Sequence, residues 1–208
     1  MPMPIQTQVG PQGPATPGTQ LPIQRSGQLG DLIVSELQPR YYEQAYRKNV
    51  FQARAALQAT SLVGTAMVGL QLWNSSSNMN LVITKLGGNI VATSATQTGV
   101  VLAAGVGQLA APTATTAASR QQNNFIGGAL GVGVAYNAGT FAAAPGVFQD
   151  LLHNTAAIAT TGEDMGYYYD MEGSIIVPPQ CWIAFAAVGA AGAASSNNHW
   201  IQWMEVPA

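Results

Sequence analysis

The sequence predicts an all-β protein, a jelly-roll-like antiparallel β-sandwich with an extended N-terminal arm. From Ala55 to the C-terminus, short apolar runs alternate with turn residues at intervals of roughly 8–15 positions, close to the spacing of strands in sandwiches. The runs would supply about eight to ten strands, which fits a jelly roll. We therefore expect a Pro/Gln-rich tail and an extended or short-helical arm over residues 1–54, and a β-sandwich domain over residues 55–208.

The N-terminal tail, residues 1–30, is rich in proline. Six of the twelve prolines lie in the first 22 residues, with Gly and Gln between them. Proline fixes φ and removes a hydrogen-bond donor, so neither a helix nor a central strand is expected there. Two interpretations stay open: a tail without fixed structure, or an arm that becomes ordered along a neighbouring subunit.

Residues 31–54 are the most charge-dense part of the chain. Leu32-Ile33-Val34 could form a short strand, and residues 41–52 could form one to three helical turns. Basic and aromatic side chains alternate in this segment, and we expect six of them to bind a partner. These six are Arg40, Tyr41, Tyr42, Tyr46, Arg47 and Phe51.

Such a mixture occurs in protein interfaces, where Tyr and Arg are enriched. It also occurs in nucleic-acid sites, where aromatic rings stack on bases, and on solvated helix faces. The net charge of −2 gives no general attraction to nucleic acid, so we favour a protein partner.

Ten segments rich in apolar and β-branched residues are predicted as strands. They are residues 63–73, 80–86, 90–97, 100–105, 131–136, 147–152, 156–160, 174–177, 181–188 and 200–206.

The connections between these strands are also predicted. Gly87-Gly88-Asn89 is typical of a hairpin turn, and residues 113–124 are expected to form a polar loop. The last two strand regions, 174–188 and 200–206, predict a closing hairpin. Small residues on both faces suggest that one face of a sheet packs on the core and the other on a neighbouring subunit.

The composition favours assembly over a freely diffusing enzyme. Charged residues make up 8% of the chain, whereas about 25% is usual, so much of the surface is expected to be covered by copies of itself or by another protein. No run reaches the roughly 20 apolar residues of a spanning helix, so no membrane partner is expected. The N-terminus has no signal-peptide pattern, and synthesis in the cytoplasm is expected.

Residues that could carry chemistry are few. Cys181 is the only cysteine, so no disulfide within the chain is possible, and a buried apolar role is expected for it. The spacing of His153 and His199 indicates no metal site. No nucleophile elbow, dinucleotide fingerprint or phosphate loop is present. The sequence therefore predicts no enzyme, no catalytic residue, no metal and no cofactor.

An acidic cluster precedes the predicted closing hairpin. It consists of Glu163, Asp164, Asp170 and Glu172 around three tyrosines. Carboxylates at this density could bind Ca²⁺ or form a glycosidase pair, but the ligand spacing of a calcium loop is missing. We interpret the cluster as a solvated loop.

Four tryptophans, Trp73, Trp182, Trp200 and Trp203, fall in or at the ends of predicted strands. Tryptophan in a strand usually belongs to the core. An exposed platform for carbohydrate is the alternative.

Several short pieces carry a resemblance to a known family. They are RYYE at 40–43, NVF at 49–51, LQLWN at 70–74, NLVI at 80–83, GSIIVPP at 173–179 and WMEVP at 203–207. Together they resemble small structural proteins of tailed bacteriophages, of the capsid decoration (cement) kind. The resemblance implies a β-sandwich or jelly-roll fold, a homotrimer, and a place on the capsid surface of the virion, bound to the major capsid protein.

The expected function is thus a non-enzymatic virion protein that binds the capsid lattice and stabilises the head. An alternative is a tail, fibre or head-spike component that binds a glycan on the host surface. A hydrolase that uses the acidic cluster is a third and weaker hypothesis.

Overall fold

The computed structural model describes residues 41–90, 99–118, 120–153, 165–188 and 197–208. The chain divides into two units, Met1–Tyr42 and Glu43–Ala208, and the fold below is that of the second. Several sequence predictions concern positions outside the described residues. They are the tail over residues 1–30, the strand at 32–34, Arg40, most of the strand at 90–97, the strand at 156–160, and the carboxylates Glu163 and Asp164.

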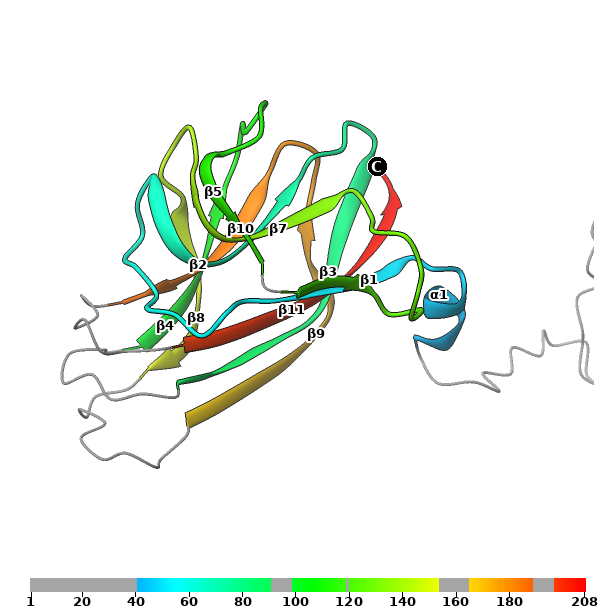
Figure 1. Cartoon of the computed structure of the whole chain (residues 1–208), viewed down its shortest axis with the longest axis horizontal. Coiled ribbons are helices and arrows are strands. Elements are labelled where there is room, and N and C mark those ends of the chain that lie inside the picture. Colours follow the sequence, from blue (N-terminus) through cyan, green and yellow to red (C-terminus); the bar gives the residue numbers. More distant parts are fainter. Residues whose placement is uncertain (1–40, 91–98, 119, 154–164, 189–196) are drawn as a thin grey trace, which may run out of the picture. The chain divides into compact units, whose positions relative to one another are not determined.

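Two antiparallel sheets make up the second unit (Figure 1). The five-stranded sheet has the order β6-β1-β11-β3-β9, and the six-stranded sheet has the order β5-β7-β2-β10-β4-β8. The strands are β1 Val50–Arg54, β2 Ala66–Asn74, β3 Met79–Ile90, β4 Gly99–Gly105, β5 Thr113–Ala117, β6 Arg120–Asn123, β7 Gly133–Thr140, β8 Gly146–His153, β9 Met165–Val177, β10 Trp182–Ala187 and β11 Asn197–Pro207.

The strand order is that of a jelly roll, so the predicted fold class is confirmed. Strands β1 to β4 alternate between the two sheets, as do β8 to β11. Within the sheets, β1 pairs with β11, β2 with β10, β3 with β9 and β4 with β8, all antiparallel. Such nested pairing of eight strands over two sheets defines the jelly roll. Strands β5, β6 and β7 lie between β4 and β8 in the chain and extend the two sheets beside β1 and β2.

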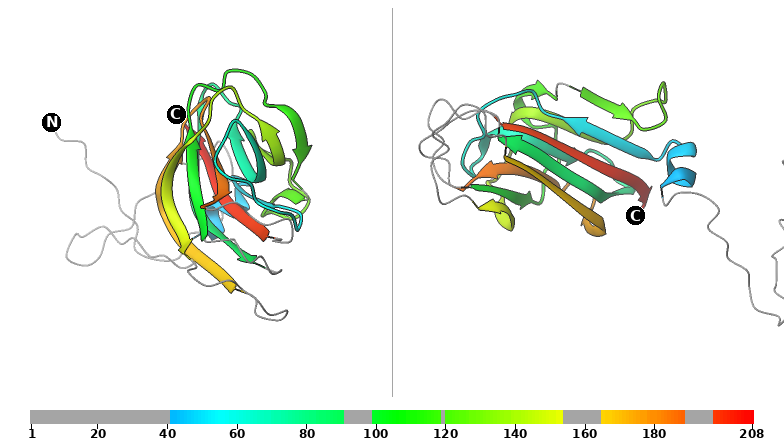
Figure 2. Two further views of the ribbon diagram at one scale, coloured as in Figure 1. Left: turned by 90° about the vertical axis from the view of Figure 1, so that its left-hand side faces the viewer. Right: turned by 90° about the horizontal axis from the view of Figure 1, so that it is seen from below.

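The main core lies between the two sheets. Strand β11 shows how it forms: buried and half-buried residues alternate along its length, so one face packs inward and the other faces outward. Trp203, which has no exposed surface, points inward, and its ring stacks on that of Phe51 at 5.9 Å between centroids. Figure 2 shows β11 between β1 and β3 in this sheet.

A second apolar cluster lies on the other face of the six-stranded sheet. There the ring of Trp182 stacks on Phe141 at 3.6 Å, and the Nε1–H of Trp73 donates to the backbone oxygen of Gln108. Phe141 and Gln108 belong to connecting segments of the same chain. The expectation that a neighbouring subunit covers this face is therefore wrong where these segments lie, because the chain covers it itself.

The predicted turn at Gly87-Gly88-Asn89 is wrong, because all three residues lie inside β3 and pair with both β9 and β11. The glycines are needed for space. A Cβ on Gly87 would lie 2.9 Å from ring atoms of Trp200, and one on Gly88 would lie 2.8 Å from the Nδ1 of His199. These side chains come from a strand more than a hundred positions further along the chain.

The predicted closing hairpin is also wrong, because β10 and β11 belong to different sheets. All six residues of β10 are buried, and the strand lies between β2 and β4. Strand β11 alternates instead. A strand that is apolar throughout needs cover on both faces, whereas an alternating strand needs it on one.

Two further boundaries differ from the sequence predictions. The predicted loop at 113–124 contains the edge strands β5 and β6, which pair with β7 and β1. The expected helix over residues 41–52 is shorter: α1 spans Tyr42–Tyr46, and β1 begins at Val50. Because β1 pairs with β6 and β11, residues 50–54 belong to the sandwich and not to the arm.

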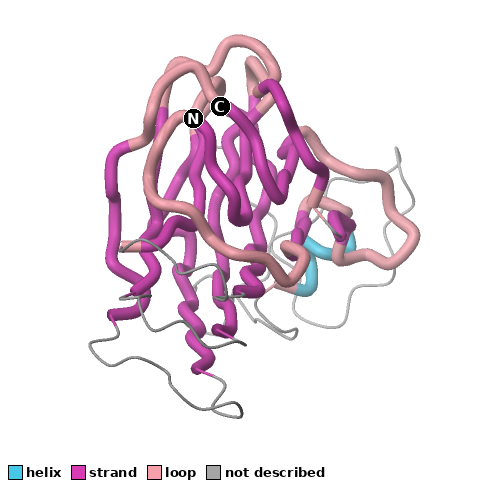
Figure 3. Tube along the Cα trace, turned by 60° about the vertical axis from the view of Figure 1, so that its left-hand side comes forward, coloured by secondary structure: helices cyan, strands magenta, loops and turns pink. Residues whose placement is uncertain are grey.

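Among the described residues, α1 is the one helix, and Figure 3 shows strands running through the body of the sandwich. No helix in the described part of the chain has the length and apolarity that a membrane span requires.

Candidate binding surfaces

Of the predicted partner-binding residues that the structure describes, some are exposed and others are not. Tyr42 and Tyr46 of α1 are 45% and 62% exposed, and Arg47, in the turn after α1, is exposed as well. Tyr41 is half-buried.

Phe51 corrects the prediction. Its side chain is 4% exposed and packs inside the sandwich, stacked on Trp203. In β1, residues alternate between the two faces, and Phe51 falls on the inner one. The ring is therefore a core residue and is not available to a partner.

The loop after β6 supplies apolar side chains next to Tyr46. The Phe125 ring meets Tyr46 edge to face at 6.5 Å, the Lys48 Nζ lies 5.1 Å from the centre of the Phe125 ring, and Ile126 is 93% exposed. We call Tyr46, Lys48, Phe125 and Ile126 the anchor surface. Sequence reasoning missed Phe125 and Ile126, although an apolar pair directly after the predicted polar loop was a signal for them.

A buried amide holds the anchor surface together. The side chain of Asn123 is 3% exposed. Its Nδ2 donates to the backbone oxygen of Lys48 at 2.7 Å, and its Oδ1 accepts from the backbone N–H of Phe125 at 2.8 Å. Asn123 thus ties the turn after α1 to the loop after β6, two segments that are far apart in the sequence.

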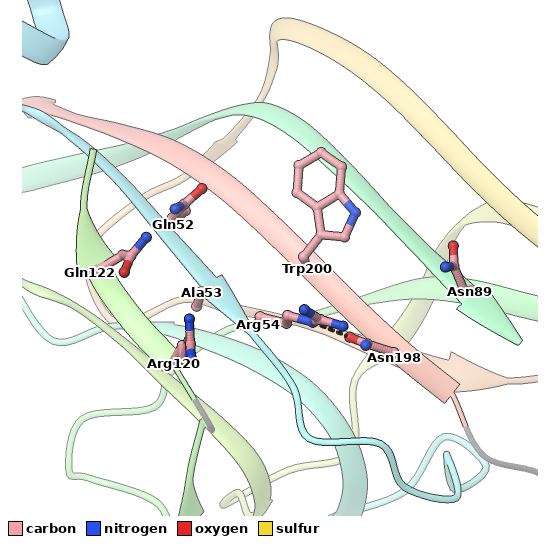
Figure 4. A pocket seen from close by; sticks show the side chains of 8 residues that line it. All are labelled: Gln52, Ala53, Arg54, Asn89, Arg120, Gln122, Asn198 and Trp200. Atoms are coloured by element: carbon pink, nitrogen blue, oxygen red, sulfur yellow. Dashed lines mark hydrogen bonds between the residues drawn. The ribbon is translucent and has the colours of Figure 1, made fainter. Parts of the chain in front are cut away.

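A groove of about 540 Å³ opens on the outer face of the five-stranded sheet. We call it the sheet groove. Its polar and aromatic lining comes from β1, β3, β6 and β11 (Figure 4). The polar and aromatic side chains of this lining are Gln52, Arg54, Asn89, Arg120, Gln122, Asn198 and Trp200, and Ala53 also lines the groove. Sequence reasoning considered Trp200 as a carbohydrate platform but had no means of placing the others beside it.

Of the four tryptophans, Trp200 is the one that is not fully buried. Trp73, Trp182 and Trp203 are at most 8% exposed, whereas Trp200 is half-buried. The core role expected for tryptophan thus holds for three of them.

His199 lies under the same sheet, on its inner face. It is 1% exposed, and its ring stacks on Phe185 at 4.7 Å. Hydrogen bonds join Nε2 to the Thr60 hydroxyl at 3.0 Å and Nδ1 to the Tyr167 hydroxyl at 2.7 Å. Burial lowers the pKa of His199 to about 3, so the ring is neutral at neutral pH. An enclosed neutral ring between two hydroxyls has a structural role.

Cys181 is a free, half-buried thiol that precedes β10 and packs against the main core. Burial raises the pKa of this thiol, and a smaller opposing effect comes from a hydrogen bond with the backbone of Gly107. A raised pKa keeps the sulfur protonated and weakly nucleophilic.

The described half of the acidic cluster lies in a strand instead of the expected loop. Asp170 and Glu172 belong to β9, and Asp170 is opposite Lys85 of β3. Nowhere in the described ranges do three His, Cys, Asp or Glu side chains gather closely enough to hold a metal ion.

Comparison of the chain with protein-family models, curated proteins and solved structures gives no match. The surfaces themselves must therefore carry any functional proposal.

Proposed function

We propose that this chain is a non-enzymatic structural protein of a bacteriophage virion, a decoration protein that binds the major capsid protein on the surface of the head. The fold is compatible with this role, since jelly rolls recur in viral capsid and lectin domains. The low charge of the chain is a second support, because covered surface needs few charges for solubility.

The anchor surface is the observation that carries the proposal. It brings Tyr46, which is 62% exposed, against the ring of Phe125, and the next residue, Ile126, is 93% exposed. Asn123 ties together the two segments that carry these side chains. Contiguous exposed apolar groups mark interaction sites. Tyrosine is also among the residues that dominate binding energy at protein interfaces.

A second surface supports self-association. It lies at the edge of the sandwich away from β6, between β8 and β9. An apolar groove of about 320 Å³ lies there, and its lining includes the exposed side chains of Val106, Phe148 and Ile176. A copy of the same chain would cover this groove in a homotrimer. A cyclic trimer also matches the local three-fold symmetry of a shell.

The bound protein would stabilise the shell by bridging neighbouring capsid subunits. Each bound trimer adds contacts between neighbouring capsid subunits, so a shell under internal pressure must break more contacts before it opens. The affinity would be concentrated in the few residues of the anchor surface.

The test is to purify particles from cells that produce this chain and to image them at subnanometre resolution. We expect jelly-roll density on the outside of the head, with the end that carries Tyr46 against the capsid lattice. Absence of the chain from the particles, or its presence only at the tail, would overturn the proposal.

A variant pair tests the anchor surface itself. Tyr46→Ala with Ile126→Ser should reduce capsid occupancy by about tenfold or more, as loss of an interface hot spot does. Val188→Ser, which changes an exposed apolar residue at the end of β10, serves as the control and should leave occupancy unchanged. Equal occupancy for both would show that another surface binds the lattice.

A further inference from the structure

The sheet groove has a second kind of chemistry that the assembly role does not use. Pairing across the sheet fixes one row of its residues: Arg120 of β6 is opposite Arg54 of β1, Arg54 is opposite Trp200 of β11, and Trp200 is opposite Gly87 of β3. Gly87 is in turn opposite Tyr168 of β9. The row therefore runs from two guanidinium groups to two aromatic rings.

The two arginines are arranged in a way that favours an anion. Side chains directly opposite on neighbouring strands lie close together, so the two guanidinium groups can bind the same group. None of the described residues that line the groove is acidic. The Nε–H of Arg54 donates to the Oδ1 of Asn198 at 2.9 Å, which holds the guanidinium in the groove (Figure 4). A carboxylate or sulfate bound between the two side chains would accept charge-assisted hydrogen bonds from both.

The other end of the row is an aromatic shelf. Because Gly87 has no side chain, the indole of Trp200 lies directly over the backbone of β3, and a Cβ there would be 2.9 Å from the ring. The ring of Tyr168 follows at 5.9 Å from Trp200 and is 56% exposed. Aromatic rings that combine an apolar body with a polar group suit ligands that are apolar on one face and polar at the rim.

Amides complete the groove. Gln52 and Gln122 lie opposite each other on β1 and β6, and Asn89 and Asn198 lie opposite each other on β3 and β11. Each amide carries both donors and an acceptor, which is what hydroxyl groups require. An aromatic ring for stacking, four amide side chains and two cations together match a sugar that carries one acidic group.

We propose that the sheet groove is a binding site for an acidic carbohydrate, with the sugar ring on Trp200 and its acidic group between Arg54 and Arg120. The site is on the sheet face, and the anchor surface is at the end of the sandwich, so this inference is independent of the proposed virion role.

A single-stranded nucleic acid is the competing ligand, since it also combines rings with negative charge. Such ligands bind in positively charged grooves that follow the backbone over several phosphates. The whole chain has seven basic residues and a net charge of −2, and only two of the basic residues line this groove. The geometry therefore favours one acidic group per ligand.

The experiment uses the intact chain and tryptophan fluorescence. Because Trp73, Trp182 and Trp203 are buried, a change in emission on titration reports mainly on Trp200. The ligands are galacturonate against its methyl ester, and sialyllactose against its methyl ester, so each acid has one acidic group and a neutral partner of the same sugar framework. A thymidine oligonucleotide is the fifth ligand. The two acids distinguish a uronic acid from a sialic acid.

We expect at least one acid to bind about tenfold or more tightly than its neutral partner, since a hydrogen-bonded charge contributes about that much affinity. Arg120→Gln should abolish this difference, and Arg120→Lys should retain part of it. Trp200→Ala should weaken the acid and the neutral sugar alike; because this variant lacks the fluorescent reporter, its binding is measured by isothermal titration calorimetry. Thermal melting of each variant confirms that it is folded, and Arg54→Gln replaces Arg120→Gln if that variant is not.

Three binding patterns, and a complete lack of binding, would each overturn the proposal. The patterns are equal binding of acid and neutral partner, an acid affinity unchanged in Arg120→Gln, and binding of the oligonucleotide alone. The lack of binding is judged at millimolar ligand. None of these outcomes bears on whether the chain is found on virions, so the two proposals fail separately.

Discussion

Gly88 and His199 are packed so closely that no side chain fits between them. A Cβ on Gly88 would lie 2.8 Å from the Nδ1 of His199, and it would also be 2.8 Å from the backbone oxygen of Asn198. Backbone atoms of β11 cannot move away without breaking the pairing with β3, so this contact fixes how closely the two strands approach.

Gly88→Ala should therefore destabilise the protein by about 1–3 kcal/mol, the usual cost of overpacking a core. The matched control is Gly146→Ala in β8, where an added Cβ would meet nothing within 4 Å. Urea unfolding of the two variants compares them directly. If both unfold at the same urea concentration, the strand approach is looser than the structure shows.

The buried imidazole of His199 predicts a dependence of stability on pH. Its pKa is about 3 in the folded chain, whereas an unfolded histidine titrates near 6.5. Between these values the unfolded chain takes up a proton that the folded chain does not. Stability is thus fully present above about pH 6.5 and falls as the pH is lowered, by an amount of the order of 4 kcal/mol once pH 3 is reached.

His199→Gln removes this titration and can keep hydrogen bonds to Thr60 and Tyr167. We expect a lower free energy of unfolding at pH 7, but a flatter decline from pH 7 to pH 4, in urea titrations at several pH values. Parallel declines for the variant and the wild type would mean that other groups cause the acid sensitivity.

Variants of Phe51 and Tyr46 should distinguish a residue that stabilises the fold from one that is available for binding. Phe51→Ala removes a ring from the core and should cost about 3–5 kcal/mol. Tyr46→Ala removes an exposed ring and should change stability by no more than about 0.5 kcal/mol. Thermal melting of both variants tests this, and a large loss for Tyr46→Ala would make that residue structural instead of an anchor.

Glu205 is a carboxylate with a structural role that the sequence did not indicate. It is 7% exposed and accepts from the backbone N–H groups of Val132 and Gly133 at 3.0 and 2.9 Å, and from the Nε1–H of Trp203 at 3.2 Å. These bonds fasten the start of β7 to β11.

Glu205→Gln should cost about 1–3 kcal/mol, because the amide NH₂ would face one of the donors that the carboxylate now satisfies. Faster hydrogen exchange at Val132 and Gly133 should accompany the loss. Asp170→Asn in β9 is the control. Unchanged exchange in Glu205→Gln would show that the loop is held by other contacts.

The periodicity of the sequence was sufficient for the fold class and for most strand positions. Strand alternation is a local property, and β11, with its alternating buried and half-buried residues, could be identified from residues 200–206 alone. The connections between the strands were harder to predict. Two consecutive glycines are typical of a turn, but in β3 they make room for Trp200 and His199. Only the partner strand distinguishes the two cases.

The candidate surfaces were predicted less well than the fold. Tyr46, Arg47 and Phe51 were all predicted to bind a partner. Tyr46 and Arg47 are exposed, whereas Phe51, from the same basic and aromatic segment, lies in the core. A shift of one residue in the register of a strand moves each side chain to the opposite face of the sheet. The register itself depends on pairing with a distant strand.

The sequence by itself determined that this is a β-sandwich with a proline-rich start and little charge, because these features depend on composition and on short-range alternation. Only the tertiary structure decided which residues meet. Arg54, Arg120 and Trp200 are spread over nearly the whole described chain, and they become neighbours because β1 lies between β6 and β11. The sheet groove is a property of strand order, which long-range packing selects.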